Sequence, residues 1–413
     1  MQLPRSPVSL ILLFSAAVPS TIAAQLTDHS KCSCYLTNGT ESRFFSHHAF
    51  YDFRSQSQYA GVSSVITTKD ETPGAPPTSK YFTSEKWSKW WILGNWNNSH
   101  NNRADATVYM SHSPNNVYIE ANPDKSPNAP QTWLTLRTSR LKDTKDSKEF
   151  QTSAEIESFS PGFRFVSVRM LARTIGAKGA VTALFTYKDS NKRAEVQESD
   201  MEVRTSDAED IIHYTNQPSL DDEGDVITQA TLNATLSDGL KWTDWAVHRM
   251  DWTPTRNTWF VNGKQVAQIS FQTPRDASKI ILNAWSDGGQ WSGNMSVGEA
   301  AYLQVQWFEV VYNSTEKVEH VHRRREEETN GRGAHGEFGD EAAEGTDAAV
   351  PRLEGRAEDV CLRVCSIDET PTLGTPVMLW DNGVGKRWEM GSTGWIPLVV
   401  MVVMVKRSAG AWR

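Results

Sequence analysis

The sequence predicts an all-β protein, built as a sandwich or a barrel, and three observations lead to that prediction. Short runs of β-branched and aromatic residues recur along residues 25–315 and are separated by turn-forming residues. The dipeptide Asn262-Gly263 stands between two such runs and is a strong β-hairpin signal. No amphipathic helical stretch of comparable quality is found. Many short strands at regular spacing are typical of sandwiches and barrels.

Each predicted strand is rich in residues whose side chains suit a pleated, half-buried surface. In chain order, we expect strands at 117–120, 132–137, 163–170, 180–187, 194–203, 245–252, 258–261, 265–267 and 279–285. Asp189-Ser190-Asn191 predicts a turn between the fourth and fifth of these. We expect Trp242, Trp245 and Trp252 to pack in the core. No internal repeat is detected.

The strand predicted at 194–203 carries three acids at alternate positions: Glu198, Asp200 and Glu202. Side chains on a strand alternate with period two, so all three project from one face, while Ser199 and Met201 point the other way. Like charges held close together cannot all ionise, so one pKa rises and another stays low. A carboxylate beside a protonated acid is what cleavage of a glycosidic bond needs. The alternative is a solvated strand face that carries acids by chance.

The N-terminus has the features of a secretory signal peptide over residues 1–24. Arg5 precedes an apolar stretch at 8–18, and the small residues of Ile22-Ala23-Ala24 favour cleavage before Gln25. The apolar run is too short for a membrane anchor. We therefore expect a secreted, extracellular protein, with association to a cell wall or cell surface left open.

In a secreted protein, sequons can carry N-glycans and cysteines can form disulfides. The sequons that could carry N-glycans begin at Asn38, Asn97, Asn233, Asn294 and Asn313. Cys32 and Cys34 lie near the mature N-terminus, and Cys361 and Cys365 lie beyond the main β region. Both spacings are poor for local bridging, so we expect disulfides that tie the C-terminal segment to the N-terminal one. A four-cysteine zinc site is the alternative, with an uncommon ligand spacing.

Net charge and composition indicate which classes of binding partner to expect. The formal net charge of −8 argues against nucleic acid. Sixteen tryptophans are many for 413 residues, and exposed indoles in secreted β proteins often stack on sugar rings. The histidines show no metal-ligand spacing, and no phosphate loop or Ser-His-Asp signature is present. We expect a monomer.

Composition changes after the β region. Residues 316–358 are charged, acidic and glycine-containing with few large apolar side chains, and we interpret them as a disordered linker. Arg323-Arg324-Arg325 within it is either a solvated charge run or a site for a basic-specific protease.

Residues 359–413 contain two cysteines and a short apolar tail at 395–405. A transmembrane span needs about 20 apolar residues, so this tail is too short to cross a bilayer. It resembles a lipid-anchor signal only in part, because the polar spacer is nearly absent and the end is polar. An error in the gene model is an equal alternative, and membrane association is expected only if the tail acts as an anchor signal.

Several stretches taken together resemble glycoside hydrolase family 16, the secreted β-glucanase and transglycosylase family with a concanavalin A-like jelly roll. The family signature, Glu-x-Asp-x-Glu, stands here as Glu198-Ser199-Asp200-Met201-Glu202. The order of further stretches reinforces it, and these lie at 154–158 with 164–169, at 245–252 with 259–263, and at 283–293. The resemblance covers roughly residues 40–315 and implies a β-sandwich jelly roll.

The resemblance also implies a retaining mechanism. Glu198 would be the nucleophile, Glu202 the general acid/base, and Asp200 would hydrogen-bond the nucleophile. Working carboxyl groups in retaining sites lie about 5–5.5 Å apart, whereas Cα atoms at i and i+4 of a flat strand are about 13 Å apart. Long glutamate side chains and a curved sheet would have to close that gap. No cofactor is implied, although some family members hold a structural calcium ion; no ligand set for one is evident in this sequence.

For sugar binding we expect Trp285, Trp291 and Tyr187 to stack on pyranose rings, and Asn216 and Gln217 to hydrogen-bond hydroxyl groups. Core packing is the alternative for each aromatic residue.

The function that this resemblance favours is endo-acting hydrolysis of O-glycosyl bonds in a β-glucan with β-1,3 or mixed β-1,3/1,4 linkages. One alternative is a cell-wall transglycosylase of the same family, which would differ in whether water or a sugar accepts the glycosyl group. Another is a non-catalytic lectin-like carbohydrate-binding module, because the same architecture serves lectins. A wall-associated structural glycoprotein is a third possibility, with mild support from the linker and the sequons.

Overall fold

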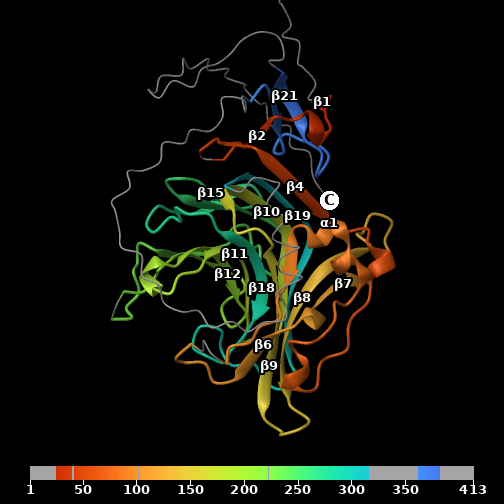
Figure 1. Cartoon of the computed structure of the whole chain (residues 1–413), viewed down its shortest axis with the longest axis vertical. Coiled ribbons are helices and arrows are strands. Elements are labelled where there is room, and N and C mark those ends of the chain that lie inside the picture. Colours follow the sequence, from red (N-terminus) through yellow and green to blue (C-terminus); the bar gives the residue numbers. More distant parts are fainter. Residues whose placement is uncertain (1–24, 40, 100–102, 222, 316–360, 382–413) are drawn as a thin grey trace, which may run out of the picture.

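A computed structural model describes residues 25–39, 41–99, 103–221, 223–315 and 361–381 of the chain (Figure 1). The expected signal peptide at 1–24, most of the expected linker, and the apolar tail at 395–405 lie outside the described residues. Among the described residues, no helix has the length and apolar character needed to cross a membrane.

Two layers of mainly antiparallel strands form the main body of the protein. The layer that contains the carboxylate strand is called the β12 sheet. Its strands, in spatial order, are β14 (Thr231–Thr235), β13 (Ile211–Gln217), β12 (Gln197–Arg204), β11 (Val181–Lys188), β18 (Lys279–Trp285) and β9 (Glu149–Ser158), with β5 (Trp91–Leu93) beside β9.

The second layer is called the β19 sheet. Its strands, in spatial order, are β8 (Thr132–Lys142), β19 (Ala300–Ser314), β10 (Phe163–Gly176), β15 (Ala246–Trp252), β16 (Asn257–Val261) and β17 (Lys264–Ile269), with β4 (His47–Asp52) on β19 and β7 (Val117–Ala121) on β8. Strand β9 pairs with both β18 and β8, and β6 (Tyr109–His112) pairs with β9, so the two layers join through β9. This arrangement confirms the all-β sandwich.

Helical structure is confined to single turns in the described residues. These turns are α1 (Glu85–Ser88) and the 3₁₀ turns η1 (His29–Lys31), η2 (Ser57–Tyr59), η3 (Lys69–Glu71), η4 (Lys80–Thr83), η5 (Pro114–Asn116) and η6 (Arg193–Glu195). The turn between β11 and β12 is longer than predicted, because η6 lies within it and β12 begins only at Gln197. The hairpin at Asn262-Gly263 is as predicted, and both residues have the positive φ angles, 49° and 77°, that a type I′ turn requires.

The core lies between the two sheets and is made of alternate residues from each strand. Leu184, Met201 and Tyr214 come from the β12 sheet, and Met170 and Trp259 are among their partners from the β19 sheet. Removal of this apolar surface from water contributes about 25 cal/mol per Å², the dominant favourable term for such a fold.

The tryptophan predictions are confirmed at two of three positions. Trp242 and Trp252 are buried in the core, but Trp245 is half-buried. Ala246, the next residue, is the one that enters the core, so strand alternation turns Trp245 to the opposite face. There its ring packs beside Trp133 and under the guanidinium of Arg173.

A second, five-stranded sheet joins the two ends of the described chain. It consists of β1 (Gln25–Leu26), β21 (Val377–Asp381), β20 (Arg363–Ser366), β2 (Cys34–Leu36) and β3 (Phe44–Phe45) in that order. Figure 1 shows these red and blue strands together at one end of the molecule, beyond β4, β10, β15 and β19. The small sheet packs on the β19 sheet through a cluster that includes Tyr35, Ile367 and Val311.

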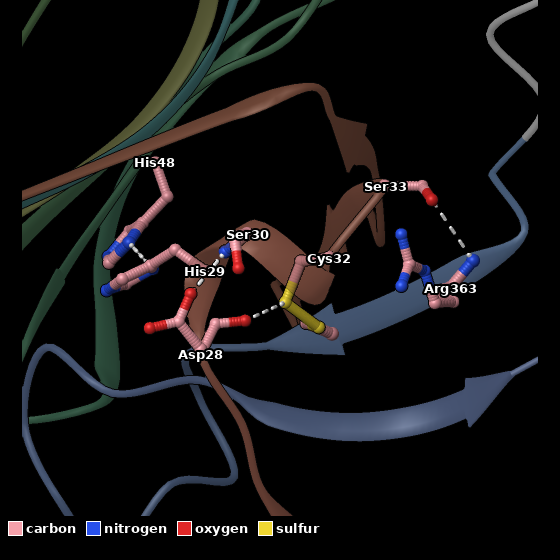
Figure 2. The surroundings of a disulfide bond; sticks show 8 residues. Asp28, His29, Ser30, Cys32, Ser33, His48 and Arg363 are labelled. Atoms are coloured by element: carbon pink, nitrogen blue, oxygen red, sulfur yellow. Dashed lines mark hydrogen bonds between the residues drawn. A yellow bond between two sulfur atoms is a disulfide. The ribbon is translucent and has the colours of Figure 1, made fainter.

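Two disulfides fasten this small sheet, as the cysteine spacing predicts. Cys32 is bonded to Cys365 and Cys34 to Cys361, with Cα–Cα separations of 5.8 and 5.5 Å. Figure 2 shows the first bridge beside η1, where Asp28 accepts a hydrogen bond from the main-chain N–H of Ser30. All four cysteines are therefore consumed as disulfides, and the four-cysteine zinc alternative is wrong.

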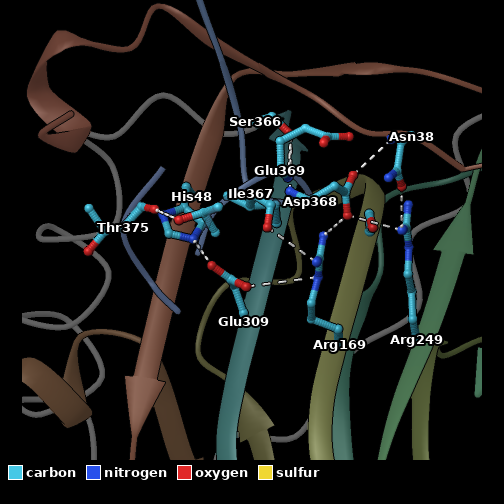
Figure 3. Close-up of polar contacts among 12 residues, drawn as sticks. Asn38, His48, Arg169, Arg249, Glu309, Ser366, Ile367, Asp368, Glu369 and Thr375 are labelled. Atoms are coloured by element: carbon cyan, nitrogen blue, oxygen red, sulfur yellow. Dashed lines mark hydrogen bonds and ion pairs between the residues drawn. The ribbon is translucent and has the colours of Figure 1, made fainter. Parts of the chain in front are cut away.

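A buried ion cluster holds the C-terminal segment against the β19 sheet (Figure 3). Arg169 on β10 and Arg249 on β15 are cross-strand neighbours, an arrangement that is unfavourable for two cations alone. Asp368 lies between them and accepts hydrogen bonds from Arg169 Nη2 at 2.6 Å and Arg249 Nη1 at 3.1 Å. Its other oxygen accepts the main-chain N–H of Asn38 at 2.8 Å. The Asp368 side chain is only 3% exposed.

We expect the substitution Asp368→Ala to lower the free energy of unfolding by about 3 kcal/mol, because it removes the buried carboxylate that joins two arginines and leaves each with a single acidic partner, Glu309 for Arg169 and Asp251 for Arg249. Urea unfolding followed by circular dichroism measures the change. Asp70→Asn is the matched control, since Asp70 pairs with Lys145 on the surface, where both side chains are more than half exposed. That control should change the free energy by less than about 1 kcal/mol. Equal effects of the two substitutions would contradict the prediction.

Candidate active site

The three acids of β12 share one face of the strand, as the alternation predicts. Met201 and Val203 point into the core, and Glu198, Asp200 and Glu202 therefore project from the opposite face of the β12 sheet, which is called the site face. Behind the strand, Ser199 is fully buried, and its hydroxyl oxygen accepts a hydrogen bond from Asn257 Nδ2 of β16 at 2.5 Å. The strand is thus held from behind by the other sheet.

Strand register determines what lies beside each acid. Tyr187, Phe185 and Ala183 of β11 stand opposite Glu198, Asp200 and Glu202, in that order. On β13 the corresponding residues are Gln217, Thr215 and His213. Phe185, Ala183 and Ile281 form an apolar cluster of their own on the site face, with Tyr187 packed against it. The acids therefore have an apolar surface on one side and polar groups on the other.

Burial and mutual repulsion raise the pKa values of the acids. Burial is the largest cause for Asp200, and the charges of Glu198 and Glu202 add to it, so its pKa lies well above its usual range. A hydrogen bond shared by Asp200 and Glu198 raises the pKa of Asp200 further and lowers that of Glu198. Burial nevertheless keeps the pKa of Glu198 raised overall. The pKa of Asp200 is thus raised and that of Glu198 is lowered by their contact, the directions expected when a neighbouring acid supplies a proton to a carboxylate.

Glu202 has a different environment. Burial raises its pKa, whereas the indole N–H of Trp291 and the cations Arg103 and Arg204 act in the opposite direction. Trp291 Nε1 donates to Glu202 Oε1 at 3.2 Å. Two glutamates on one face thus differ in their partners: Glu198 interacts with the side chain of Asp200, and Glu202 accepts a hydrogen bond from an indole. Such a pair can divide the roles of nucleophile and proton donor.

The aromatic residues predicted to bind sugar lie near the acids. Trp285 ends β18 on the site face, and the Arg103 guanidinium lies 5.7 Å from its ring centroid. Tyr187 is adjacent to Glu198 across the strand pair, and its hydroxyl donates to Asp189 Oδ1 at 3.1 Å. Trp291 lies against Glu202. The structure therefore brings all three rings to the site.

The prediction for Asn216 is wrong. Its register position opposite Ser199 turns its side chain away from the site face, and it is fully buried. There its Oδ1 accepts from Asn257 Nδ2 at 2.8 Å and its Nδ2 donates to the carbonyl of Phe271 at 2.9 Å. Gln217 is one residue further along β13, and alternation places it on the site face, where its side chain lowers the pKa of Asp200. Its Oε1 accepts from the N–H and hydroxyl of Ser219, so its amide group is left to donate.

Sequence reasoning missed Glu155 as a site residue. Glu155 on β9 lies in one row with Asn283, Ala183 and Glu202 across four neighbouring strands. It is 6% exposed, and its Oε1 accepts the indole N–H of Trp96 at 2.7 Å. Burial raises its pKa to about 7, against the lowering effect of hydrogen bonds from Trp96 and Asn283. Its alternation with Glu157 was visible in the sequence, but the pairing of β9 with β18 was not.

We expect the substitution Glu155→Gln to stabilise the protein at pH 8 but not at pH 4. The carboxyl holds its proton up to about pH 7 when folded but only to its ordinary value of 4.5 when unfolded. The native state therefore binds more protons across this window, and the free energy of unfolding falls as pH rises through it. The glutamine variant removes that loss, which is about 3 kcal/mol for this shift in pKa. Urea unfolding at the two pH values measures it; an equal difference at both would contradict the prediction.

No group of three or more His, Cys, Asp or Glu side chains suited to hold a metal ion occurs in the part of the chain that the structure describes.

Comparison with known families identifies the family of the chain. A sequence model of the glycosyl hydrolases family 16 matches residues 95–308, a stretch that includes β12 with its three acids. The chain belongs to this family. No match was found in a search of the curated proteins.

Several solved structures are similar to this chain. The endo-β-1,3-glucanase from Pyrococcus furiosus has 18% sequence identity and a TM-score of 0.45, covering 68% of this chain and 99% of that one. The laminarinase catalytic domain from Thermotoga maritima has 16% identity and a TM-score of 0.42, covering 55% and 93%. A prokaryotic β-1,3-1,4-glucanase derived from a mouse hindgut metagenome has 16% identity and a TM-score of 0.41, covering 65% and 99%.

Proposed function

We propose that this protein is a secreted, retaining, endo-acting glycoside hydrolase that cleaves a β-glucan with β-1,3 or mixed β-1,3/1,4 linkages. The observation that carries the proposal is the pair Glu198 and Glu202 on one face of β12, with Asp200 between them, in a member of family 16. Retaining glycosidases use two carboxyl groups in this way, one as nucleophile and one as acid and then base.

In the first step, a Glu198 oxygen attacks the anomeric carbon while Glu202 gives its proton to the glycosidic oxygen, so the C–O bond to the leaving sugar breaks. The glycosyl group is then held as an ester of Glu198. In the second step, Glu202 takes a proton from water, the water oxygen attacks the anomeric carbon, and Glu198 leaves as a carboxylate. Two inversions give net retention of configuration.

Asp200 supports both steps through its hydrogen bond to Glu198. The bond stabilises the negative charge on Glu198 before attack and after release, when the carboxylate is free. Gln217, whose amide faces Asp200, fixes the orientation of that carboxyl group. Tyr187 and Trp285 provide flat apolar faces beside the acids on which pyranose rings can stack.

Two features support export. The N-terminal sequence at 1–24 has the pattern of a signal peptide, and paired cysteines persist in oxidising compartments. Expression in a secreting host should release a protein whose N-terminal sequence begins at Gln25, read by mass spectrometry. Retention of residues 1–24 in the cell-associated fraction would contradict export.

The test of the activity is incubation of the secreted protein with laminarin and lichenan, with products identified by mass spectrometry and the anomer formed first identified by proton NMR. We expect shorter oligosaccharides, initial β configuration, and loss of activity in Glu198→Gln. Products longer than the substrate would instead indicate a transglycosylase. Binding of the glucan by both proteins with no product from either would overturn the enzyme proposal in favour of a lectin-like module.

A further inference from the structure

Trp291 is held in one position by contacts on several sides. It lies in the loop after β18, and its main-chain carbonyl accepts a hydrogen bond from Arg204 Nε at 2.8 Å. The same guanidinium lies 4.6 Å from the centre of the indole ring, a cation–π contact. The ring of His213 meets the indole edge-to-face at 5.3 Å. One ring is thus packed by a cation and by an imidazole from two neighbouring strands.

Asp207 anchors both of these neighbours. Its Oδ2 lies 2.6 Å from His213 Nε2 and 3.7 Å from Arg204 Nη1. His213 is also the register partner of Glu202 across β12 and β13, and Arg204 is two residues beyond Glu202 on the same strand face. The contacts therefore form one connected network. Asp207 contacts His213 and Arg204, both of these pack against Trp291, and Trp291 donates a hydrogen bond to Glu202.

We propose that Trp291 is a positioning residue for the carboxyl group of Glu202, with Asp207, His213 and Arg204 holding its indole in place, and that its ring is not a sugar-stacking surface. The inference rests on the proposed hydrolase function. An indole N–H can only donate a hydrogen bond, and in a protonated carboxyl group the oxygen without the proton is the stronger acceptor. Because Oε1 accepts the Trp291 N–H, the contact favours the acidic proton on Oε2, the oxygen that would then give it to the glycosidic oxygen.

The charged groups that face Glu202 come from each neighbouring element. Glu198 and Asp200 share its strand, Arg204 follows it, His213 with Asp207 lies beside it, and Arg103 approaches from the segment before β6. Loss of the indole N–H removes one group that lowers the pKa of Glu202, so the pKa should rise. The basic limb of the pH profile should therefore move to higher pH in a variant that lacks this donor.

The substitution Trp291→Phe tests the inference, because it keeps an aromatic ring and removes only the N–H and part of the ring. We expect kcat/KM on the glucan to fall by about 10- to 100-fold, the range for general acid catalysis at its lower end. On a dinitrophenyl glycoside of the same oligosaccharide, whose leaving group needs no proton, the loss should be less than about threefold. KM should change little. A stacking ring would give another result: near-normal rates in Trp291→Phe, and a raised KM on both substrates in Trp291→Ala.

Trp245→Phe is the matched control. Its indole is also half-buried and also has a guanidinium, that of Arg173, 4.6 Å from the ring centre, but it lies on the β19 sheet away from the site face. This variant should retain wild-type rates on both substrates. A loss of similar size in both variants would attribute the effect to general destabilisation and overturn the inference.

A second measurement does not depend on activity. In protein with ¹⁵N-labelled tryptophan, the indole resonance that Trp291→Phe removes identifies Trp291. Its chemical shift should titrate with pH in the wild type and should stop titrating in Glu202→Gln. If the pH dependence of this chemical shift is the same in Glu202→Gln as in the wild type, the inference is overturned even if the enzyme is active. A titrating resonance in a protein that cleaves no glycan supports the Trp291–Glu202 contact and overturns the hydrolase proposal instead.

Discussion

Glu198→Ala should lower kcat on the glucan by at least about 10⁴-fold, which corresponds to about 5 kcal/mol of transition-state stabilisation. The substitution removes the atom that would form the covalent bond to the sugar, and alanine offers no replacement nucleophile. The remaining machinery stays intact, because Glu202 keeps its Trp291 hydrogen bond and β12 stays fixed from behind by the bond between Ser199 and Asn257.

Added azide separates the roles of the two glutamates. In Glu198→Ala, azide can enter the space of the lost side chain and attack from the same side, so a β-linked substrate gives an α-glycosyl azide. In Glu202→Ala, the ester on Glu198 still forms from a substrate with a good leaving group, and azide replaces water to give a β-glycosyl azide. Product anomers are assigned by proton NMR. The opposite pair of anomers would exchange the proposed roles.

Asp200→Asn should reduce activity less than Glu198→Ala does. Asparagine keeps the shape of the side chain and can still donate to Glu198, but it removes a group whose pKa is raised by burial and by both neighbouring charges. We expect a loss of about 10- to 100-fold, well below that for Glu198→Ala. A loss as large as that of Glu198→Ala would show that Asp200 takes part directly in bond formation.

The double substitution Cys32→Ser with Cys34→Ser should lower the free energy of unfolding by about 2–5 kcal/mol. The two disulfides join residues that are 333 and 327 positions apart, so each closes almost the whole described chain into a loop. Cross-links across long loops remove the most conformational entropy from the unfolded chain. In the native state, the small sheet would still be held by its strand pairing, the cluster of Tyr35 with Ile367, and the Asp368 ion contacts.

Urea unfolding with and without a reductant measures this effect. The variant should match the reduced wild type, and addition of reductant should leave the variant unchanged. The site lies on the β12 sheet, whereas the small sheet packs on the β19 sheet, so kcat at 20 °C should change by less than about threefold. Equal stability of variant and oxidised wild type would contradict the prediction.

A protease site engineered at residues 323–325 gives a covalent test of the same bridges. After cleavage, the C-terminal piece should stay attached on a non-reducing gel and separate on a reducing one, because Cys361 and Cys365 are bonded to the N-terminal segment. Separation without reductant would show that these pairs do not form.

Gly374 is a further requirement for the packing of the C-terminal segment. It has φ of +72°, a conformation that side-chain-bearing residues rarely adopt, and a Cβ atom there would collide with the ring of Phe50 on β4. The close approach of this segment to β4 is therefore specific to a glycine at this position.

The strands could be predicted from the sequence because their information is local. Alternation and β-branched residues identified β11 and β18 to within one residue, whereas β10 runs six residues beyond its predicted end, to Gly176. The positive φ angles at Asn262 and Gly263 follow from the only residue types that tolerate them readily. The same alternation placed Glu198, Asp200 and Glu202 on one face. The sequence also predicted that the disulfides join the N-terminal and C-terminal segments, since the spacing within each cysteine pair does not suit a local bridge.

The neighbours of each side chain could not be predicted, because they depend on which strands pair and in which register. Asn216 and Gln217 are adjacent and similar in chemistry, yet one faces Asn257 in the interior and the other faces Asp200 on the site face. A shift of one residue in the register of β13 would exchange them.

The sequence by itself determined the fold class, the family signature and the shared face of the three acids, since each depends on residues a few positions apart. Only the tertiary structure decided that Glu155 joins the row of Glu202, that Trp291 holds Glu202, and that Asp368 lies between two arginines. These contacts join residues that are tens to hundreds of positions apart. Long-range contacts of this kind arise from packing between sheets and loops, and no local pattern in the chain encodes them.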